Sequence, residues 1–94
     1  MPRPRLRRRI RFTPNVSYFK PQGIPMGSLK VVELSIEETE ALRLKNIKDF
    51  DQAECAREMK TSQSTFQRIL SSAYKKTSQA LVEGMAIKIS KREN

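Results

Sequence analysis

A short capped helix followed closely by a much longer one is the feature that most constrains this fold. Asp51 and Ser62 are typical helix N-caps, and Glu54, three residues after Asp51, completes a capping box. The pattern predicts one helix over about residues 52–59 and another over 63–84, ending at a glycine. Two helices separated by so short a break must cross steeply, which is the helix-turn-helix pattern.

The apolar residues around this break predict how the two helices meet. Ala56 is small enough to let the two backbones approach, while Met59, Phe66 and Ile69 fill the angle between them. Thr61 is expected to be partly buried in the turn. The inner face of the long helix follows helical spacing through Phe66, Ile69, Leu70, Ala73, Thr77, Ala80 and Leu81.

The opposite face of the long helix begins with uncharged polar residues rather than lysines. Gln63, Gln67 and Arg68 are predicted to read base edges, because Gln can pair bidentately with adenine and Arg with guanine. The side chains expected at phosphates or at the margin of such a contact are Lys60, Ser62, Ser64, Thr65 and Ser71. The alternative is a plain solvated face, which any amphipathic helix shows.

Lys60 lies in the turn, where this pattern often has glycine. A lysine in the left-handed conformation costs about 1 kcal/mol or more. Either the turn therefore has a different geometry, or Lys60 is retained for a contact.

A third helix is predicted upstream of these two. Ser35 and Glu38 form another capping box, and the helix runs to about residues 45–46. Its predicted inner side is Ala41, Leu42, Leu44 and Ile47.

The segments outside the helices are predicted to be loop or short strand. Residues 13–28 are rich in Pro and Gly and are predicted to form a loop. Its apolar side chains, expected to contact the core, are Val16, Tyr18, Phe19 and Ile24. Residues 29–34 are predicted to form a short strand or an extended lead-in to the helix. Residues 86–90 are a candidate strand that pairs with residues 10–12.

The charge of the chain is unevenly placed. The net charge is +9, of which residues 1–12 supply +6, residues 13–59 supply −2 and residues 60–94 supply +5. Such a surface favours a polyanionic partner over simple solubility. The arm is expected to follow a DNA backbone or enter a minor groove through Arg3, Arg5, Arg7, Arg8 and Arg9, or else to bind nucleic acid without selection.

Composition argues against several other classes of protein. The chain has no His and a single Cys, Cys55, so we expect no metal site, no cofactor and no enzymatic activity. Cys55 is predicted to be a small core residue. No apolar run is long enough for a membrane span or a secretory signal, and together with the lone cysteine this favours a cytoplasmic protein.

The predicted fold class is therefore mainly α: a helix-turn-helix domain with an extended basic N-terminal arm, and short terminal strands as an option. The expected organisation is a basic arm over 1–12, a Pro/Gly-rich extended segment over 13–34, the helical domain over 35–84 and a short C-terminal segment over 85–94.

Four motifs also resemble a known family. They are "YFKPQGIP" (residues 18–25), "EALRL" (40–44), "QAECAREM" (52–59) and "STFQRIL" (64–70). In this order they resemble small bacterial and archaeal proteins described as predicted DNA-binding proteins of unknown function. The helix-turn-helix of that family is similar to region four of sigma factors, a winged-helix-like class. The resemblance spans residues 2–90 and implies DNA binding by residues 52–71. Many members have Arg where this chain has Gln63.

These observations favour a sequence-specific binder of double-stranded DNA that regulates transcription. A single module has limited contact area, so a homodimer on two half-sites is expected, joined through the later half of the long helix around Ala73, Thr77 and Ala80 or through a paired terminal strand. The alternatives are an adaptor that contacts RNA polymerase and a non-specific nucleic-acid binder acting through the arm.

Overall fold

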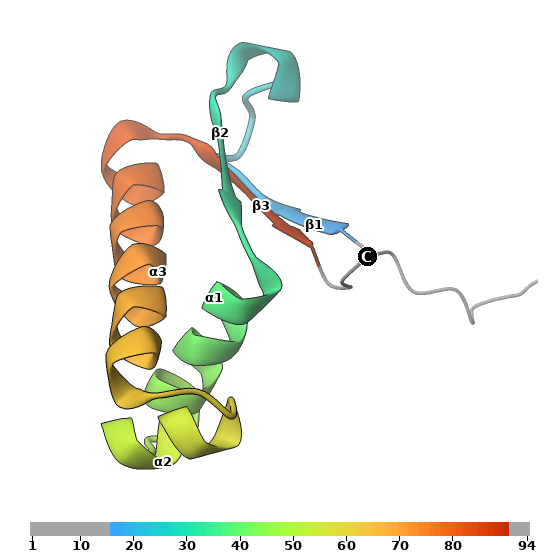
Figure 1. The fold of residues 1–94 in the computed structure, drawn as a ribbon. Coiled ribbons are helices and arrows are strands. Elements are labelled where there is room, and N and C mark those ends of the chain that lie inside the picture. The colour runs from blue at the N-terminus through green and yellow to red at the C-terminus, as the bar shows by residue number, and fades with distance from the viewer. Residues whose placement is uncertain (1–15, 91–94) are drawn as a thin grey trace, which may run out of the picture.

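The computed structural model describes residues 16–90, which form a small sheet and a group of helices (Figure 1). The elements are β1 (Val16–Phe19), a 3-10 turn (Met26–Ser28), β2 (Val31–Leu34), α1 (Ile36–Leu42), a π-helical turn (Arg43–Ile47), α2 (Gln52–Glu58), α3 (Gln63–Glu83) and β3 (Ala86–Ser90). The helical part agrees with the expected class, but the three-stranded sheet makes the described fold mixed rather than purely helical.

The sheet has the order β1-β3-β2, with β3 antiparallel to β1 and parallel to β2. Ile87 of β3 lies opposite Phe19 on one side and Val32 on the other. The predicted strands at 29–34 and 86–90 are confirmed. Residues 10–12, the expected partner of β3, lie outside the described residues.

The prediction that residues 13–28 form only a loop is wrong for β1. Val-Ser-Tyr-Phe has the β-branched and aromatic residues that suit a strand, but prolines on both sides hide that signal. The anchoring role expected for this segment is also wrong: Tyr18, Phe19 and Ile24 are exposed. Tyr18 and Phe19 lie in β1 itself, and Val16 at the start of this strand is half-buried.

α1 begins at the predicted cap and ends in a π-helical turn. The Ser35 hydroxyl accepts from the Glu38 amide at 3.0 Å, and the Glu38 carboxylate accepts from the Ser35 amide at 2.8 Å. The wider turn over Arg43–Ile47 adds residues to the helical repeat and rotates those that follow. Ile47 is consequently 75% exposed, which corrects the prediction that it faces inward.

Phe66 lies at the centre of a core built from three helices. Phe66, Leu44 and Cys55 are the largest fully buried side chains, and they come from α3, the π-helical turn and α2. Ala41 and Ala56 complete this cluster with Leu70. Because alanines occupy the α1 and α2 contacts, the helices approach closely around the aromatic ring. The predicted role of Ala56 at the crossing agrees with its burial.

α3 spans the molecule and links its two ends. The sheet lies near the C-terminal end of α3, and α2 lies near its N-terminal end (Figure 1). Gly84 ends the helix in the left-handed conformation with φ 69°, as the sequence predicted. Leu81 is 81% exposed, so the predicted inner face ends at Ala80.

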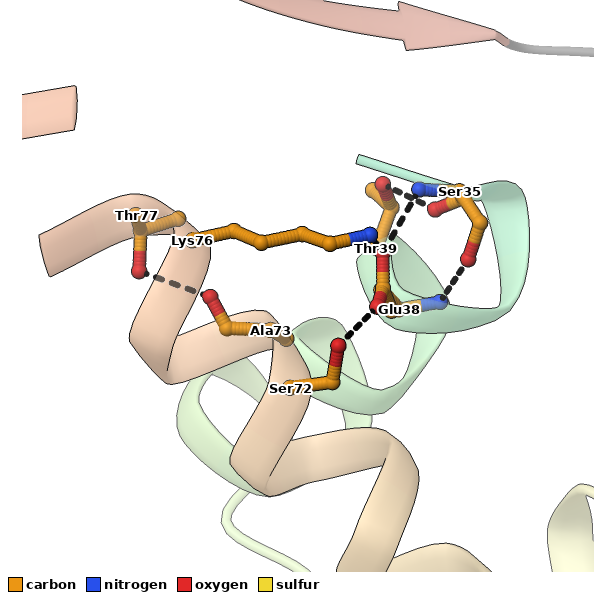
Figure 2. Close-up of polar contacts among 7 residues, drawn as sticks. All are labelled: Ser35, Glu38, Thr39, Ser72, Ala73, Lys76 and Thr77. Carbon is orange, nitrogen blue, oxygen red and sulfur yellow. Dashed lines mark hydrogen bonds and ion pairs between the residues drawn. The ribbon is translucent and has the colours of Figure 1, made fainter. Parts of the chain in front are cut away.

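A buried carboxylate joins α1 to the middle of α3 (Figure 2). Besides the Ser35 amide, the Glu38 carboxylate accepts from the Ser72 hydroxyl and from the Lys76 ammonium, the latter at 2.9 Å. The Glu38 side chain is only 9% exposed and that of Lys76 34%. Since these donors come from two helices, the carboxylate fixes how α1 lies on α3.

The pKa of the Glu38 carboxyl reflects this setting. Burial alone raises the pKa, but the hydrogen bonds from Ser72, from the Ser35 backbone and from Lys76, with the Lys76 charge, outweigh burial and leave it below its usual value of 4.5. Because the pKa is lower in the folded protein, the ionised carboxylate stabilises the fold at pH values above the unfolded-state pKa. That stability is lost as the pH falls below about 4.5 through the folded-state pKa.

Replacing Glu38 with Gln should lower the free energy of unfolding by about 1–3 kcal/mol at neutral pH, because the charge-assisted hydrogen bonds are lost. The difference from the wild type should shrink as the pH falls below about 4.5, where the wild-type carboxylate is itself protonated. Urea unfolding followed by circular dichroism at several pH values measures both effects.

Glu40→Gln is the matched control, because Glu40 forms an exposed pair with Arg43 three residues along the same chain segment. Exposed ion pairs of this kind contribute little to the free energy of unfolding. A loss in Glu40→Gln as large as that in Glu38→Gln would contradict the role given to the buried carboxylate.

Candidate nucleic-acid interface

α2 is held in place by its cap and by its buried side. The Asp51 carboxylate accepts from the Glu54 amide at 2.8 Å, as the sequence predicted for the N-cap. The Glu54 side chain makes no return bond to the Asp51 amide, so the predicted capping box is only half formed. Cys55 and Ala56 face inward, with Phe50 half-buried beside them. Burial raises the pKa of the Cys55 thiol, so it stays neutral, in keeping with the predicted core role. α2 therefore presents one fixed side to α3 and leaves the other exposed.

The turn after α2 closes with two backbone hydrogen bonds. The Thr61 amide donates to the Ala56 carbonyl at 3.0 Å, and the Lys60 amide donates to the Arg57 carbonyl at 3.1 Å. This is the Schellman pattern, which requires a left-handed residue directly after the helix. Lys60 is that residue, with φ 57°. The turn thus keeps the geometry for which glycine is suited, although a lysine occupies it.

α3 starts at the predicted cap, within a group of hydroxyls. The Ser62 hydroxyl accepts from the Thr65 amide at 3.1 Å and lies 3.0 Å from the Thr65 hydroxyl and 3.3 Å from that of Ser64. Ser62 is therefore engaged in capping, while Ser64 remains exposed. The helix start combines these hydroxyls with amides that have no partner within the helix.

The first turns of α3 have a buried side and an exposed side, as predicted. Phe66 is fully buried, and Leu70 is only 4% exposed. Gln67 and Arg68, the residues that follow Phe66, are exposed, and so is Gln63 one turn earlier. The three predicted base-reading side chains therefore share the solvent side of the same helical segment whose other side forms the core.

The hydrogen bonds on this exposed side are long. Gln67 donates to the Ser71 hydroxyl at 3.4 Å, and Arg68 donates to the Thr65 hydroxyl at 3.4 Å. Hydrogen bonds of this length are weak, and the partners are accessible to water. Exchanging them for contacts with another molecule costs little, so the amide and guanidinium groups are available for recognition.

Gln52 joins this surface, although its own residue type and position did not single it out. Its side-chain amide donates to the Gln63 carbonyl at 3.4 Å, which brings the start of α2 beside the start of α3. The contact links residues 11 apart in sequence, so no helical periodicity signals it. The sequence placed Gln52 only at the start of the predicted helix over 52–59 and of the range 52–71 that the family resemblance implied.

Three expectations concern features that residues 16–90 show in part or not at all. The arm residues 3–9 lie outside residues 16–90. Between residues 16 and 90, no group of three or more His, Cys, Asp or Glu is placed to hold a metal ion. Within the same range, every helix is too short or too polar to cross a bilayer.

The comparison with protein families identifies the relatives of this chain. A family model described as "Protein of unknown function DUF134" matches residues 1–93. The chain belongs to this family. No solved structure matches it.

Several curated members of the family are about half identical to this chain. A UPF0251 protein of Halothermothrix orenii is 50% identical over 88 residues, which are 94% of this chain and 65% of that protein. UPF0251 proteins of Caldanaerobacter subterraneus and Dehalococcoides mccartyi are each 52% identical over 89 residues, which are 95% of this chain and 75% and 76% of those proteins. The chain thus spans about two thirds to three quarters of these relatives.

The left-handed turn gives a direct test of its geometry. Lys60→Gly should raise the free energy of unfolding by about 1 kcal/mol, because glycine adopts positive φ without the Cβ penalty. Lys60→Ala is the control, since alanine loses the charge but keeps that penalty. Chemical denaturation of the three proteins measures the difference; equal stability of both variants would contradict the strained turn.

Proposed function

We propose that α2, the turn and the start of α3 form a helix-turn-helix that places α3 in the major groove of double-stranded DNA. In this role the chain is a sequence-specific DNA-binding protein that regulates transcription. The observation that carries the proposal is the opposed orientation of adjacent side chains: Phe66 is buried, while Gln67 and Arg68 are exposed.

The exposed side chains have the chemistry that base recognition needs. Gln63 and Gln67 each offer an amide donor and acceptor that match adenine, and Arg68 offers the paired donors that match guanine. The major groove is about 12 Å wide and admits one helix. Because α3 is anchored by Phe66, these three side chains keep a constant orientation as the helix approaches the groove.

Groups suited to phosphate surround this reading surface. Lys60 and Ser64 are exposed at the start of α3, and Ser71 lies beside Gln67. The helix start adds a partial positive charge and unpaired amides, both of which favour phosphate. Phosphate contacts on either side of the reading residues would set the register of α3 along the groove.

The position of α3 within the fold also supports this use. Its N-terminal third, with the reading residues, lies at the end of the molecule occupied by α2, and the sheet lies at the other end (Figure 1). The sheet therefore does not cover the proposed reading surface. α2 supports the start of α3 from the inner side through Cys55 and Ala56.

Removing a base-reading side chain should affect specific and random DNA differently. Gln67→Ala or Arg68→Ala should weaken binding to a selected duplex by about 1–3 kcal/mol and binding to random duplex much less. Gln22→Ala is the matched control, because Gln22 is an exposed glutamine outside α2, α3 and the turn between them. Fluorescence anisotropy measures all affinities; equal losses on both duplexes would remove base reading from these residues.

The arm should contribute affinity without selectivity. Deleting residues 1–9 should weaken binding to every duplex and flatten its dependence on salt. The deletion removes five arginines, so if each neutralises about one phosphate, the slope of log K against log salt concentration becomes shallower by about 4 to 5. Titrations at several salt concentrations measure the slope, and a slope unchanged by the deletion would rule out phosphate contacts by the arm.

A further inference from the structure

The outer side of the C-terminal half of α3 forms a surface that the proposed DNA contact does not use. Val82 is 84% exposed there. It borders a shallow hollow whose lining is Lys75, Ser78, Gln79, Val82 and Glu83, here called the pairing face. All five residues are exposed.

The pairing face carries charges of both signs, so two copies of the same face can form opposite-charge pairs. Lys75 and Glu83 have opposite charge and flank Gln79 at equal distances of four residues. Among the contacts of residues 16–90, neither forms an ion pair. Glu83 is also the sole acidic residue of α3. A two-fold axis through Gln79 would therefore bring each lysine against the glutamate of another copy.

We propose that a second copy of this chain packs antiparallel against the pairing face, with Lys75 of each copy opposite Glu83 of the other. An antiparallel arrangement satisfies both charge pairs at once, whereas a parallel one would oppose lysine to lysine. Val82 supplies the apolar contact, and the small side chain of Ser78 allows the helices to approach. The face is small, so the dimer is expected to be weak and concentration-dependent.

This arrangement leaves the main reading residues accessible. Gln67 precedes Gln79 by twelve residues, which places it about 18 Å along the axis and about a third of a turn around the helix. The α3 helix of the second copy overlaps this helix only from about residue 75 onward, since Glu83 is the last helical residue. The base-reading side chains therefore remain outside the paired segment.

The pairing also yields a spacing for DNA, a consequence that rests on the proposed function. Gln63, Gln67 and Arg68 centre on residue 66, which is thirteen residues, or about 20 Å, from the two-fold axis. Their separation in the dimer is about 39 Å for fully antiparallel helices and about 35 Å when the helices cross at about 50°. Half-sites one turn of DNA apart are separated by about 34–36 Å.

A charge-exchange experiment on the full chain tests the pairing without DNA. Sedimentation equilibrium at low salt is measured for the wild type, Lys75→Glu, Glu83→Lys and the protein carrying both substitutions. Each single substitution should raise the dimer dissociation constant about tenfold or more, because two opposite pairs become two like pairs. The combined protein should return to near the wild-type value.

The direction of the two single effects separates pairing from overall charge. Lys75→Glu lowers the net positive charge and Glu83→Lys raises it, so a non-specific charge effect would strengthen one dimer and weaken the other. Specific pairing weakens both. Lys30→Glu, an exposed substitution with the same charge change as Lys75→Glu, should not weaken the dimer. Thermal unfolding confirms that all variants are folded.

A wild-type chain that stays monomeric at every concentration would overturn the proposal, and so would a combined protein no better than the single variants. These failures are distinct from failure of the proposed function. A dimer that binds no DNA would leave the pairing intact, and a monomer that binds DNA specifically would leave the reading surface intact.

Discussion

The burial of Phe66 is the constraint on which the rest of the structure depends. Its ring lies fully buried among residues from α1, the π-helical turn and α2, and it comes from the second turn of α3. One buried aromatic side chain at a helix crossing fixes the rotation of α3 about its own axis, because any other rotation would expose the ring to water. The side that carries Gln67 and Arg68 faces outward as a direct consequence.

The length of α3 relates the other features to one another. The left-handed turn at Lys60 and the proposed reading surface lie near its start. In its middle, Ser72 and Lys76 hold the buried carboxylate of Glu38, and at its end Gly84 leads into β3. Since one rigid helix contains all of these positions, the proposed reading surface, the attachment of α1 and the proposed pairing face have fixed orientations relative to one another.

The sequence predicted the parts of this fold that depend on local chemistry. The caps at Ser35, Asp51 and Ser62, the stop at Gly84 and the inward direction of Phe66 all follow from side chains within a few residues of each other, and the structure confirms them. The candidate surface around Gln67 was predicted for the same reason, because helical spacing determines which residues share a side.

The parts that the sequence did not predict depend on contacts between distant segments. Val16–Phe19 becomes a strand because β3, some 70 residues later, pairs with it. The position of Glu38 three residues after Ser35 predicts only a capping role. Ser72 and Lys76, which also bind its carboxylate, lie more than 30 residues away, so local sequence does not predict these contacts. The inward orientation predicted for Ile47 is wrong because a π-helical turn breaks the regular helical spacing.

Selection of bound sequences from a pool of random duplexes tests the central claim most directly. The full chain and a protein in which Gln63, Gln67 and Arg68 are all replaced by Ala would be taken through the same rounds. The wild type should enrich one defined motif, and the substituted protein should retain DNA without enriching it. Enrichment of the same motif by both proteins, or of none by the wild type, would contradict the account.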